Sequence, residues 1–490
     1  MFALLSAGLL AAGGCVSYDT YRQERAERAA RHFDQIRDRE LPGGTVLTLV
    51  DCIELALLRN VDLEVSRLEE RIARERVTAE VLGMLPDLEV SNNWSMRSNR
   101  PGSSSKSIST GGATYNYSQS SEKFENDFKI EMALSVLDFG LAYFGSSQAS
   151  DKAFIETEQL RRTEQNLRLE VTRVYLKVAA TQDAMEITGK LLEKCRNVTQ
   201  LIAGMLEAKT ISPLRLYDEY ERFIKLQQRL MEYRRSYEDG CIELRALLGM
   251  APTSQIRLDT SMLRRLPTFG TPDIEMLELA ALTQRPELMS MDMQAHVTLT
   301  ESRKIILMMF PNVRIFTDWN DSSNIFLYKS SWFELGVRAA YNLLKLPQQV
   351  ARYRVTRAEF DAMDTRTLAQ TIAVMAQVRI AHANLLEVRD KYELDEKVYQ
   401  VYQAHLSQAE KNVESGGALS QLELDRMRIE CAETDIQRVI SLSRWLLGNY
   451  QQMNAAGVST LDPEVLDKMA AEVVPESDKT TGKTAAKKSE

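Results

Sequence analysis

The chain carries few of the side chains with which enzymes do acid–base, nucleophilic or metal chemistry. Its four histidines are scattered through stretches of helical periodicity, at His32, His296, His382 and His405. The sequence has none of the HExxH, GxSxG, GxGxxG or Walker patterns that mark common catalytic and nucleotide-binding sites. A lone histidine on a helix is more often structural than catalytic. We therefore expect no enzymatic activity, no metal site and no cofactor.

One cysteine has a chemical role of a different kind. Cys15 ends the apolar run MFALLSAGLLAAGGC, whose last small residues resemble the lipobox of a bacterial lipoprotein signal peptide. This pattern predicts a signal peptide at 1–14 and acylation of Cys15; the alternative is an ordinary signal peptide with an incidental cysteine. Val16, rather than an aspartate, follows the cysteine, which is typical of outer-membrane lipoproteins. Acyl chains would tether the chain to a membrane without making it span.

The other four cysteines predict neither a zinc site nor a disulfide. No two of Cys52, Cys195, Cys241 and Cys431 have the C-x2-C spacing of a zinc site. If the chain turns back near Ser212, Cys195 lies 17 residues before the turn and Cys241 lies 29 residues after it. This offset of 12 residues is about 18 Å along a helix, beyond the reach of a disulfide.

The composition is that of a chain with a packed core and no nucleic-acid surface. Of its 490 residues, 44% are hydrophobic and 27% are charged, and the formal net charge is −8. No cluster of Lys and Arg has the pattern of a phosphate-binding patch, so we expect no nucleic-acid partner. No apolar run beyond the N-terminus has the roughly 18 residues that a spanning helix needs, so any membrane crossing must use strands.

Two stretches that lie 225 positions apart have nearly the same pattern. LPDLEVSNNWSMRS begins at Leu85, and FPNVRIFTDWNDSS begins at Phe310. In both, a proline ends a helical pattern, and an alternation of apolar and polar residues leads to a tryptophan, Trp94 or Trp319. The sequence therefore predicts two internal repeats in which a helix gives way to a strand.

Each predicted repeat runs helix, strand, strand, long helix, return helix. The long helices cover 141–208 and 347–414, and each has 68 residues, about 100 Å in length. In the first repeat the shorter helices 51–84 and 213–249 total 71 residues, so end to end they match one long helix. Apolar residues of the first long helix recur at steps of three, four or seven, which predicts a coiled coil. These are Leu167, Val171, Val174, Val178, Met185, Leu192, Cys195, Val198, Ile202 and Met205.

The predicted fold class is mainly α with a small β part: long antiparallel coiled-coil hairpins and four strands. Each strand has one apolar face, but four strands are too few to close a barrel. In a membrane an open sheet edge leaves unpaired backbone groups at a cost of several kcal/mol each, so several copies must combine. Trp94, Trp319 and Trp332 are then expected at the membrane interfaces. The alternative is a soluble sheet packed on the helices.

In its motifs and their order, the chain resembles the TolC-type outer-membrane efflux proteins over about residues 48–454. The residues that carry the resemblance are TLVDCIELAL, LPDLEV, FPNVRI and SVLDFG, and the hairpin tips AKTISPLRLYDEY and ESGGALSQLELDR. The resemblance implies a homotrimer in which three times four strands form a 12-stranded barrel, continued by a 12-helix periplasmic tunnel. It also implies that a periplasmic adaptor (membrane fusion) protein and an inner-membrane pump are partners.

The resemblance also assigns the parts of the chain. They are a signal peptide at 1–14, a lipidated segment and part of an equatorial girdle at 15–47, a first repeat at 48–249, an equatorial linker at 250–272, a second repeat at 273–454, and a largely disordered tail at 455–490. The expected location is the outer membrane of a Gram-negative bacterium, with a lipid anchor and a large periplasmic part.

Two kinds of site follow from the resemblance. Contacts with the adaptor are expected at the tips, at Lys209 and Thr210 in the first and at Gly416 and Gly417 in the second. Gly417 matches the glycine that family members often carry there, whereas Lys209 replaces it in the first tip.

The second site is the periplasmic entrance, at Glu423 or Asp425. An acid near the second tip lines the constricted entrance in this family, and three copies would form a ring of carboxylates. The alternatives are that Glu423 only caps the last helix, through the S-x-x-E pattern that starts at Ser420, or that Asp425 lines the pore.

The function implied is that of an exit duct of a tripartite efflux or type I secretion system. The alternative from another class is a periplasmic coiled-coil scaffold or adaptor lipoprotein without a channel. That alternative explains the helices but gives the paired strands no role.

Overall fold

The fold is described here from a computed structural model of the chain. It describes residues 17–40, 44–104, 108–112, 116–207, 213–264, 269, 272–414, 421–461, 465–466 and 469. The chain divides into two compact units. The helical unit comprises 1–66, 160–286 and 371–490, and the sheet unit comprises 67–159 and 287–370. Among the described residues, no helix combines the length and the apolar character needed to cross a membrane.

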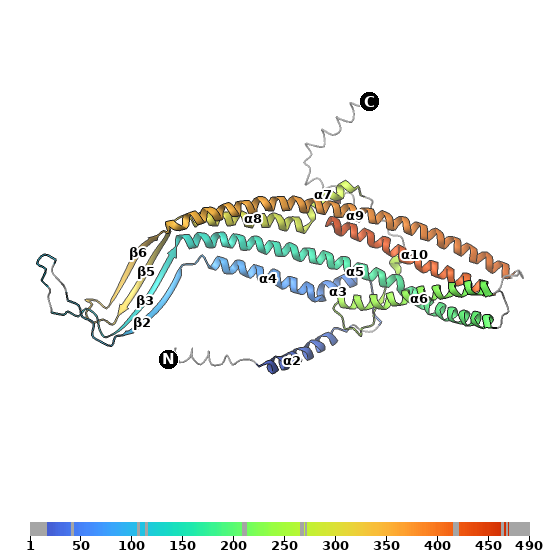
Figure 1. Cartoon of the computed structure of the whole chain (residues 1–490), viewed down its shortest axis with the longest axis horizontal. Helices are drawn as coiled ribbons and strands as arrows, with labels where there is room; N and C mark the ends of the chain where they lie inside the picture. The colour runs from blue at the N-terminus through green and yellow to red at the C-terminus, as the bar shows by residue number, and fades with distance from the viewer. Residues whose placement is uncertain are drawn as a thin grey trace, which may run out of the picture. The chain divides into compact units, whose positions relative to one another are not determined.

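The same order of elements occurs twice along the chain (Figure 1). After an N-terminal helix α2 (Tyr18–Arg37), the first half contains α3 (Leu49–Arg59), α4 (Val61–Leu82), β2 (Asp87–Met96), β3 (Phe124–Ser135), α5 (Val136–Glu207) and α6 (Pro213–Leu247). The second half contains α7 (Ile274–Gln284), α8 (Pro286–Leu307), β5 (Asn312–Ser322), β6 (Ser331–Ala340), α9 (Leu346–Glu414) and α10 (Gln421–Ala456). The long helices α5 and α9 have 72 and 69 residues, close to the predicted 68.

The first long helix begins at Val136, earlier than predicted. The alternation of apolar residues placed Val136 on the strand and the helix start after LDFG. In the structure, the Ser135 hydroxyl accepts a hydrogen bond from the Asp138 N–H at 3.2 Å and donates to Asn312 at 2.8 Å. Ser135 therefore caps the helix, because a side-chain oxygen at this place satisfies a free N–H of the first turn.

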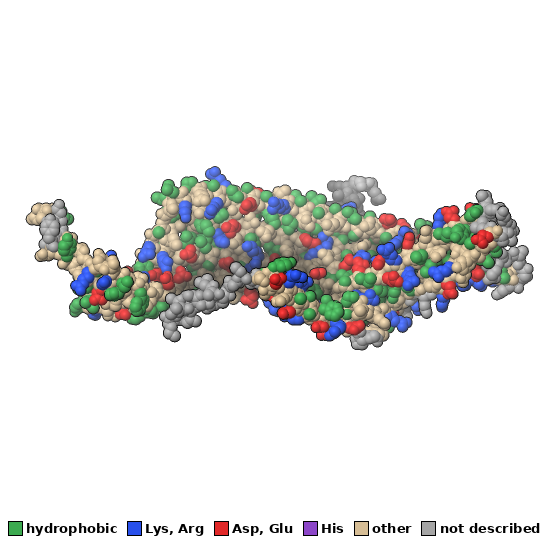
Figure 2. Space-filling view, turned by 60° about the horizontal axis from the view of Figure 1, so that its bottom comes forward, with side chains coloured by type: hydrophobic (Ala, Val, Ile, Leu, Met, Phe, Trp, Pro, Cys, Tyr) green, Lys and Arg blue, Asp and Glu red, His purple; other side chains and the backbone are tan. Residues whose placement is uncertain are grey.

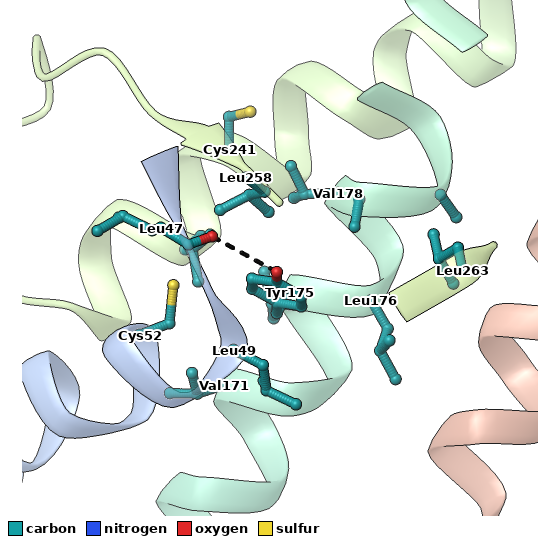
Figure 3. Close-up of a cluster of buried hydrophobic side chains, with 14 of the residues drawn as sticks. Leu47, Leu49, Cys52, Val171, Tyr175, Leu176, Val178, Cys241, Leu258 and Leu263 are labelled. Atoms are coloured by element: carbon teal, nitrogen blue, oxygen red, sulfur yellow. Dashed lines mark hydrogen bonds between the residues drawn. The ribbon is translucent and has the colours of Figure 1, made fainter. Parts of the chain in front are cut away.

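The core of the helical unit forms along the predicted seam of α5. Tyr175 lies in its main cluster (Figure 3), 2% exposed, among residues of α3, α5 and α6. The Tyr175 hydroxyl donates to the Asp259 carbonyl at 2.7 Å, and burial raises the pKa of Tyr175 above its usual value, so the phenol stays protonated. The buried members of the predicted seam are Val171, Val174, Val178, Cys195 and Ile202.

A two-stranded parallel ribbon is attached to this core. It pairs β1 (Val46–Leu47) with β4 (Arg257–Leu258). The Gln182 side chain donates to the Leu258 carbonyl and accepts from the Leu258 N–H, both at 2.9 Å. Tyr175 and Gln182 are two turns apart on α5, so one face of that helix holds the ribbon.

The predicted helix 51–84 is two helices, because Asn60 interrupts it with an extended backbone (φ −66°, ψ 125°). The Asn60 side chain accepts from the Leu63 N–H at 3.0 Å and donates to the Leu247 carbonyl at 3.1 Å. One side chain thus provides a hydrogen-bond partner for a free N–H in the first turn of α4 and for a free carbonyl at the end of α6. Arg285 holds the equivalent place in the second half, where its Nη1 donates to two carbonyls of the last turn of α10 at 3.1 and 3.3 Å.

The helices α6 and α10 also end in the same way. Gly249 and Gly457 follow them with φ of +60° and +71°. In both cases the N–H of the next residue bonds back to a carbonyl five positions earlier, the Schellman arrangement. A Cβ built on Gly249 would lie 2.5 Å from the Arg59 carbonyl oxygen, and one on Gly457 would lie 3.1 Å from that of Gln284. The end of each return helix therefore packs closely on the end of a short helix.

Gly249→Ala should destabilise the helical unit by about 2–4 kcal/mol, because it adds a steric overlap with Arg59 to the strain of a left-handed backbone. Gly44→Ala is the matched control, since Gly44 also has a positive φ (+92°) but its Cβ would meet nothing within 4 Å. The control should cost only about 1 kcal/mol. Thermal unfolding followed by circular dichroism compares the two, and equal losses would show that the close approach to Arg59 is unimportant.

Candidate functional site

The sheet unit contains one antiparallel sheet in the order β2-β3-β5-β6. Residues that pair directly across antiparallel strands lie on the same face, so the register assigns a face to every strand residue. One face is apolar, and Trp94 (78%) and Leu335 (74%) are among its most exposed members. Its apolar residues are Leu88, Val90, Trp94, Met96, Phe124, Phe128, Ile130, Met132, Leu134, Val313, Ile315, Trp319, Phe333, Leu335, Val337 and Ala339. An exposed apolar surface of this extent requires an apolar phase or a partner to cover it.

The opposite face of the same sheet is charged. Lys129 Nζ lies 2.5 Å from Glu131 and 2.9 Å from Asp318, and Arg314 Nη2 lies 2.9 Å from Glu131. These four residues come from β3 and β5 and form one ion-pair network, in which Asp318 is only 3% exposed. The charged residues of this face are Asp87, Glu89, Glu125, Asp127, Lys129, Glu131, Arg314, Asp318, Glu334 and Arg338. Acids outnumber bases by seven to three, so the face is negative.

A glycine leaves room for an aromatic ring to lie over the neighbouring strand on this polar face. Gly336 on β6 pairs with Phe316 on β5. A Cβ on Gly336 would lie 2.3 Å from the Phe316 ring, so no other residue fits without moving it. The Arg338 guanidinium lies 5.4 Å from the centroid of the same ring, within the range of a cation–π contact.

The three predicted interface tryptophans do not share one face. Trp94 and Trp319 lie on the apolar face, where Trp319 packs edge-on against Phe128 with centroids 5.9 Å apart. Trp332 pairs with Asn320 and lies on the polar face. The alternation already pointed to this, because Phe333, Leu335, Val337 and Ala339 form one apolar set and Trp332 falls between them with Glu334 and Arg338.

The predicted entrance acids lie near the start of α10. Glu423 belongs to its first turn and is half-buried, as is Asp425. The Asp425 carboxylate lies 3.8 Å from Arg428, which also pairs with Glu410 on α9 at 2.9 Å. Lys209, Thr210, Gly416, Gly417 and the capping Ser420 lie outside the described residues, as does Cys15.

A second ion pair joins α10 to α6 near the same end. Arg426 Nη1 lies 2.7 Å from Glu219, and both side chains are about four-fifths buried, with 22% and 20% exposed. Further along, Arg229 pairs with Glu433 at 3.1 Å. These contacts connect the return helices of the two halves of one chain.

Two histidines make side-chain contacts between helices, and the four cysteines that the structure describes are buried. His296 contacts Asp151 at 2.7 Å, and His382 contacts Gln452 at 3.0 Å. Within the described residues, no three His, Cys, Asp or Glu side chains gather as a metal site would need. All four cysteines covered by the structure are free and buried. Burial raises the pKa of Cys52 to about 12 and that of Cys195 to about 11, so both remain unreactive thiols near neutral pH.

The ion-pair network on the polar face was not found from the sequence. Lys129 and Glu131 stand out as charges on the polar side of one predicted strand. Their partners Arg314 and Asp318 are more than 180 positions away along the chain. The local signal is that charges recur at every second residue of β3, from Glu125 to Glu131, whereas the register that joins them to β5 is a tertiary property.

Comparison with known proteins found similarity to outer membrane channel proteins. The model of the outer membrane efflux protein family matches residues 52–250. No curated protein matches the chain by sequence.

Several solved channel structures share the fold. The MtrE outer membrane channel of Neisseria gonorrhoeae is 16% identical, with a TM-score of 0.63, and the match covers 84% of this chain and 90% of that one. A membrane protein from Pseudomonas aeruginosa is 15% identical, with a TM-score of 0.64 and coverage of 84% and 92%. The CmeC outer membrane channel of Campylobacter jejuni is 13% identical, with a TM-score of 0.61 and coverage of 88% and 90%.

These matches extend over most of the chain and of each channel, whereas the family model covers the first half. The family match rests on sequence, whereas the structural matches rest on a shared fold, which in this chain is mainly helical with a small antiparallel sheet. Together they confirm the resemblance, over residues 52–250 by sequence and over most of the fold by structure, to the TolC-type outer membrane efflux proteins.

Proposed function

We propose that the protein is the outer-membrane exit duct of an export system, and that it works as a homotrimer. The observation that carries the proposal is the sheet of four strands with one apolar and one charged face. Such a sheet suits a barrel wall, with the apolar face toward lipid and the charged face toward a water-filled lumen.

The edges of the sheet require several copies of the chain, and the resemblance to the TolC-type proteins implies that their number is three. The outermost strands of the sheet are β2 and β6, and each has only one neighbour within it. In lipid an unpaired strand edge costs several kcal/mol per backbone group. Pairing of β6 with β2 of the next copy removes both edges, and three copies give 12 strands. The helices α5, α6, α9 and α10 then supply the wall of a periplasmic tunnel.

The proposed partners are those of a tripartite system. MtrE and CmeC are described as outer membrane channels. By its resemblance to the TolC-type proteins, we propose that this chain receives its cargo from an inner-membrane pump through a periplasmic adaptor. We assign adaptor contact to the tips, at Lys209, Thr210, Gly416 and Gly417. Acylation of Cys15 would add a tether to the outer membrane, while the barrel would supply most of the membrane affinity.

The experiment that tests the proposal is single-channel recording. The full chain, extracted in detergent, should behave as a trimer and give stable ion conductance in a planar lipid bilayer. A periplasmic scaffold lipoprotein, the competing function, should be soluble without detergent once its acyl chains are removed and should give no conductance. If a correctly folded trimer gives no conductance, the proposed function as a duct is wrong.

Glu423→Gln should reduce the cation selectivity of the channel severalfold while leaving thermal stability unchanged. Glutamine can still cap α10, but it removes the three carboxylates that the trimer would place at the entrance. Bi-ionic reversal potentials measure the change. Asp425→Asn is the matched control, because Asp425 already lies 3.8 Å from Arg428. Unchanged selectivity in the first variant together with altered selectivity in the second would assign the entrance to Asp425.

A further inference from the structure

Basic side chains gather at one end of the sheet. Arg97 follows β2, Lys123 precedes β3, Lys329 precedes β6, and Arg100 lies three residues beyond Arg97. All four side chains are exposed, and none of them has a carboxylate within ion-pairing distance among the residues that the structure describes. Beyond the strand ends the described residues carry these four bases and one acid, Glu122, so this end is positive, whereas the charged face of the sheet and the chain as a whole are negative.

Hydrogen bonds hold these residues at the same end. The Arg97 N–H donates to the Lys123 carbonyl at 2.9 Å and extends the pairing of β2 with β3. The turn between β5 and β6 is joined to the segment before β3, because the Asn324 side chain donates to the Ser120 carbonyl at 3.1 Å. Lys123 and Lys329 are therefore placed by ordered backbone on neighbouring segments.

Exposed apolar side chains accompany these bases. The turn at 325–328 reads Ile-Phe-Leu-Tyr, and its side chains are between 40% and 100% exposed. The turn is ordered, since the Phe326 N–H donates to the Asn324 side chain at 3.1 Å. Phe124, 59% exposed, lies beside Lys123, whose Nζ is 5.8 Å from the ring centroid. In Figure 2, hydrophobic and charged side chains are both exposed over the strands, at the left of the view.

The turn lies just beyond the ends of the strands. Asp127 pairs with Ser322, and the next residue, Ser323, donates its N–H to the Asn126 carbonyl at 3.0 Å. On β5 and β6 the apolar face ends with Trp319 and Phe333, because the next residues on that face are Asp321 and Ser331. The turn 325–328 is therefore a separate apolar patch at the same end of the sheet as the basic residues.

We propose that Arg97, Arg100, Lys123 and Lys329, together with the turn 325–328, form a basic rim that binds the phosphate-bearing lipid head groups of the outer leaflet. This rests on the proposed function, which places the sheet in the outer membrane. The rim lies at the strand ends remote from α4 and α5, hence on the side away from the periplasm. Aromatic and apolar residues suit the boundary of the hydrocarbon, and neighbouring Lys and Arg pair with phosphates.

Two other occupants fit less well. A second copy of the rim would bring four unpaired positive charges against four others, which is unfavourable. Free inorganic phosphate would satisfy the cations but would leave the four apolar side chains of the turn in water. A lipid carries both the phosphate and the apolar phase, so it satisfies both halves of the surface.

Fluorescence quenching by brominated lipids tests the rim. The full chain is reconstituted as the trimer in phosphatidylcholine vesicles that contain increasing amounts of brominated phosphatidylcholine or brominated phosphatidylglycerol. Bromine quenches tryptophans in contact with the lipid, and Trp94 lies three residues before Arg97. Each basic residue near an anionic surface should favour phosphatidylglycerol by about fivefold at low salt. The wild-type protein should therefore prefer it by at least about tenfold, and salt at about 1 M should remove the preference.

The decisive variant replaces Arg97, Arg100, Lys123 and Lys329 by glutamine. Its preference for phosphatidylglycerol should fall below about twofold, because each copy loses the four positive charges of the rim. The matched control replaces four exposed bases of the helical unit and should keep the preference. These are Lys190, Lys194, Arg196 and Lys397.

The remaining outcomes separate the rim from the duct. If the rim variant keeps the preference, or if both lipids quench the wild-type protein equally, the rim is wrong while the membrane-embedded sheet stands. If neither lipid quenches, the sheet does not lie in the bilayer, and the proposed function fails together with the rim.

Discussion

Arginine in place of Leu335 should prevent insertion of the chain into a membrane, whereas arginine in place of its neighbour Glu334 should not. Leu335 lies on the apolar face, 74% exposed, and is paired with Thr317 on β5. An arginine on the lipid side of a strand costs about 2–4 kcal/mol near the middle of a bilayer, hence roughly 6–12 kcal/mol for a trimer. That is comparable with the whole stability of many proteins. Recovery of trimer from the outer-membrane fraction, and conductance of that trimer, measure the loss.

Glu334→Arg is the matched control because it adds the same side chain one residue away, on the charged face. Insertion should be retained, and the cation selectivity should fall, since each copy changes the charge of the lumenal face by two units. Normal insertion of both variants would falsify the assignment of the apolar face to lipid. The covering surface would then be protein, as in the scaffold alternative.

Arg285→Met should destabilise the helical unit by about 3–5 kcal/mol. The guanidinium is buried, with 2% of the residue exposed, and it donates to the carbonyls of Asn454 and Ala455 and, at 2.7 Å, to Gln377. Methionine keeps much of the apolar stem of the side chain. The loss of stability comes mainly from the buried acceptors, which are left without a hydrogen-bond donor. For a chain of this size the melting temperature should fall by roughly 3–5 °C.

Asn60→Ala supplies the comparison, because Asn60 holds the equivalent place in the first half. It makes one hydrogen bond to α6 and one to α4, so its loss should cost about 1–2 kcal/mol. Circular dichroism of the two purified variants gives both values. A smaller loss for Arg285→Met than for Asn60→Ala would mean that water or a neighbouring side chain replaces the guanidinium.

The long helices and the strands were predictable because both produce local periodicity. The seam from Leu167 to Met205 repeats at the coiled-coil spacing, and its buried members confirm the prediction. The alternation in β3 predicted Ile130, Met132 and Leu134 on one face, where the register puts them. These patterns need only a few neighbouring residues, so one sequence is sufficient to reveal them.

The interruptions and the cross-strand contacts were not predictable in the same way. Asn60 and Arg285 break two helices at equivalent places, but only the second break has a local signal. Arg285 is followed by Pro286, and proline disfavours a helical residue before it and favours the first position of a helix. Asn60 has no such neighbour, and its partner at the end of α6 is nearly 190 positions away along the chain. The ion pairs of Lys129 and Glu131 with Asp318 and Arg314 depend likewise on the register between β3 and β5, which local alternation does not fix.

The ribbon of β1 and β4 has a consequence for the order in which the chain folds. It pairs Val46 with Arg257, and Asn60 contacts Leu247 across 187 residues, so the first half closes on itself over a long separation. The second half closes separately, through Arg285 and Asn454, 169 residues apart. Closing such loops is entropically slow, and contact order sets the rate. In a chain that emerges N-terminus first, the first closure can form once Leu258 has emerged, before any residue of α7 does. Because the architecture is duplicated, the chain can fold through two successive loop closures, each over less than half of its length, instead of one closure over its whole length.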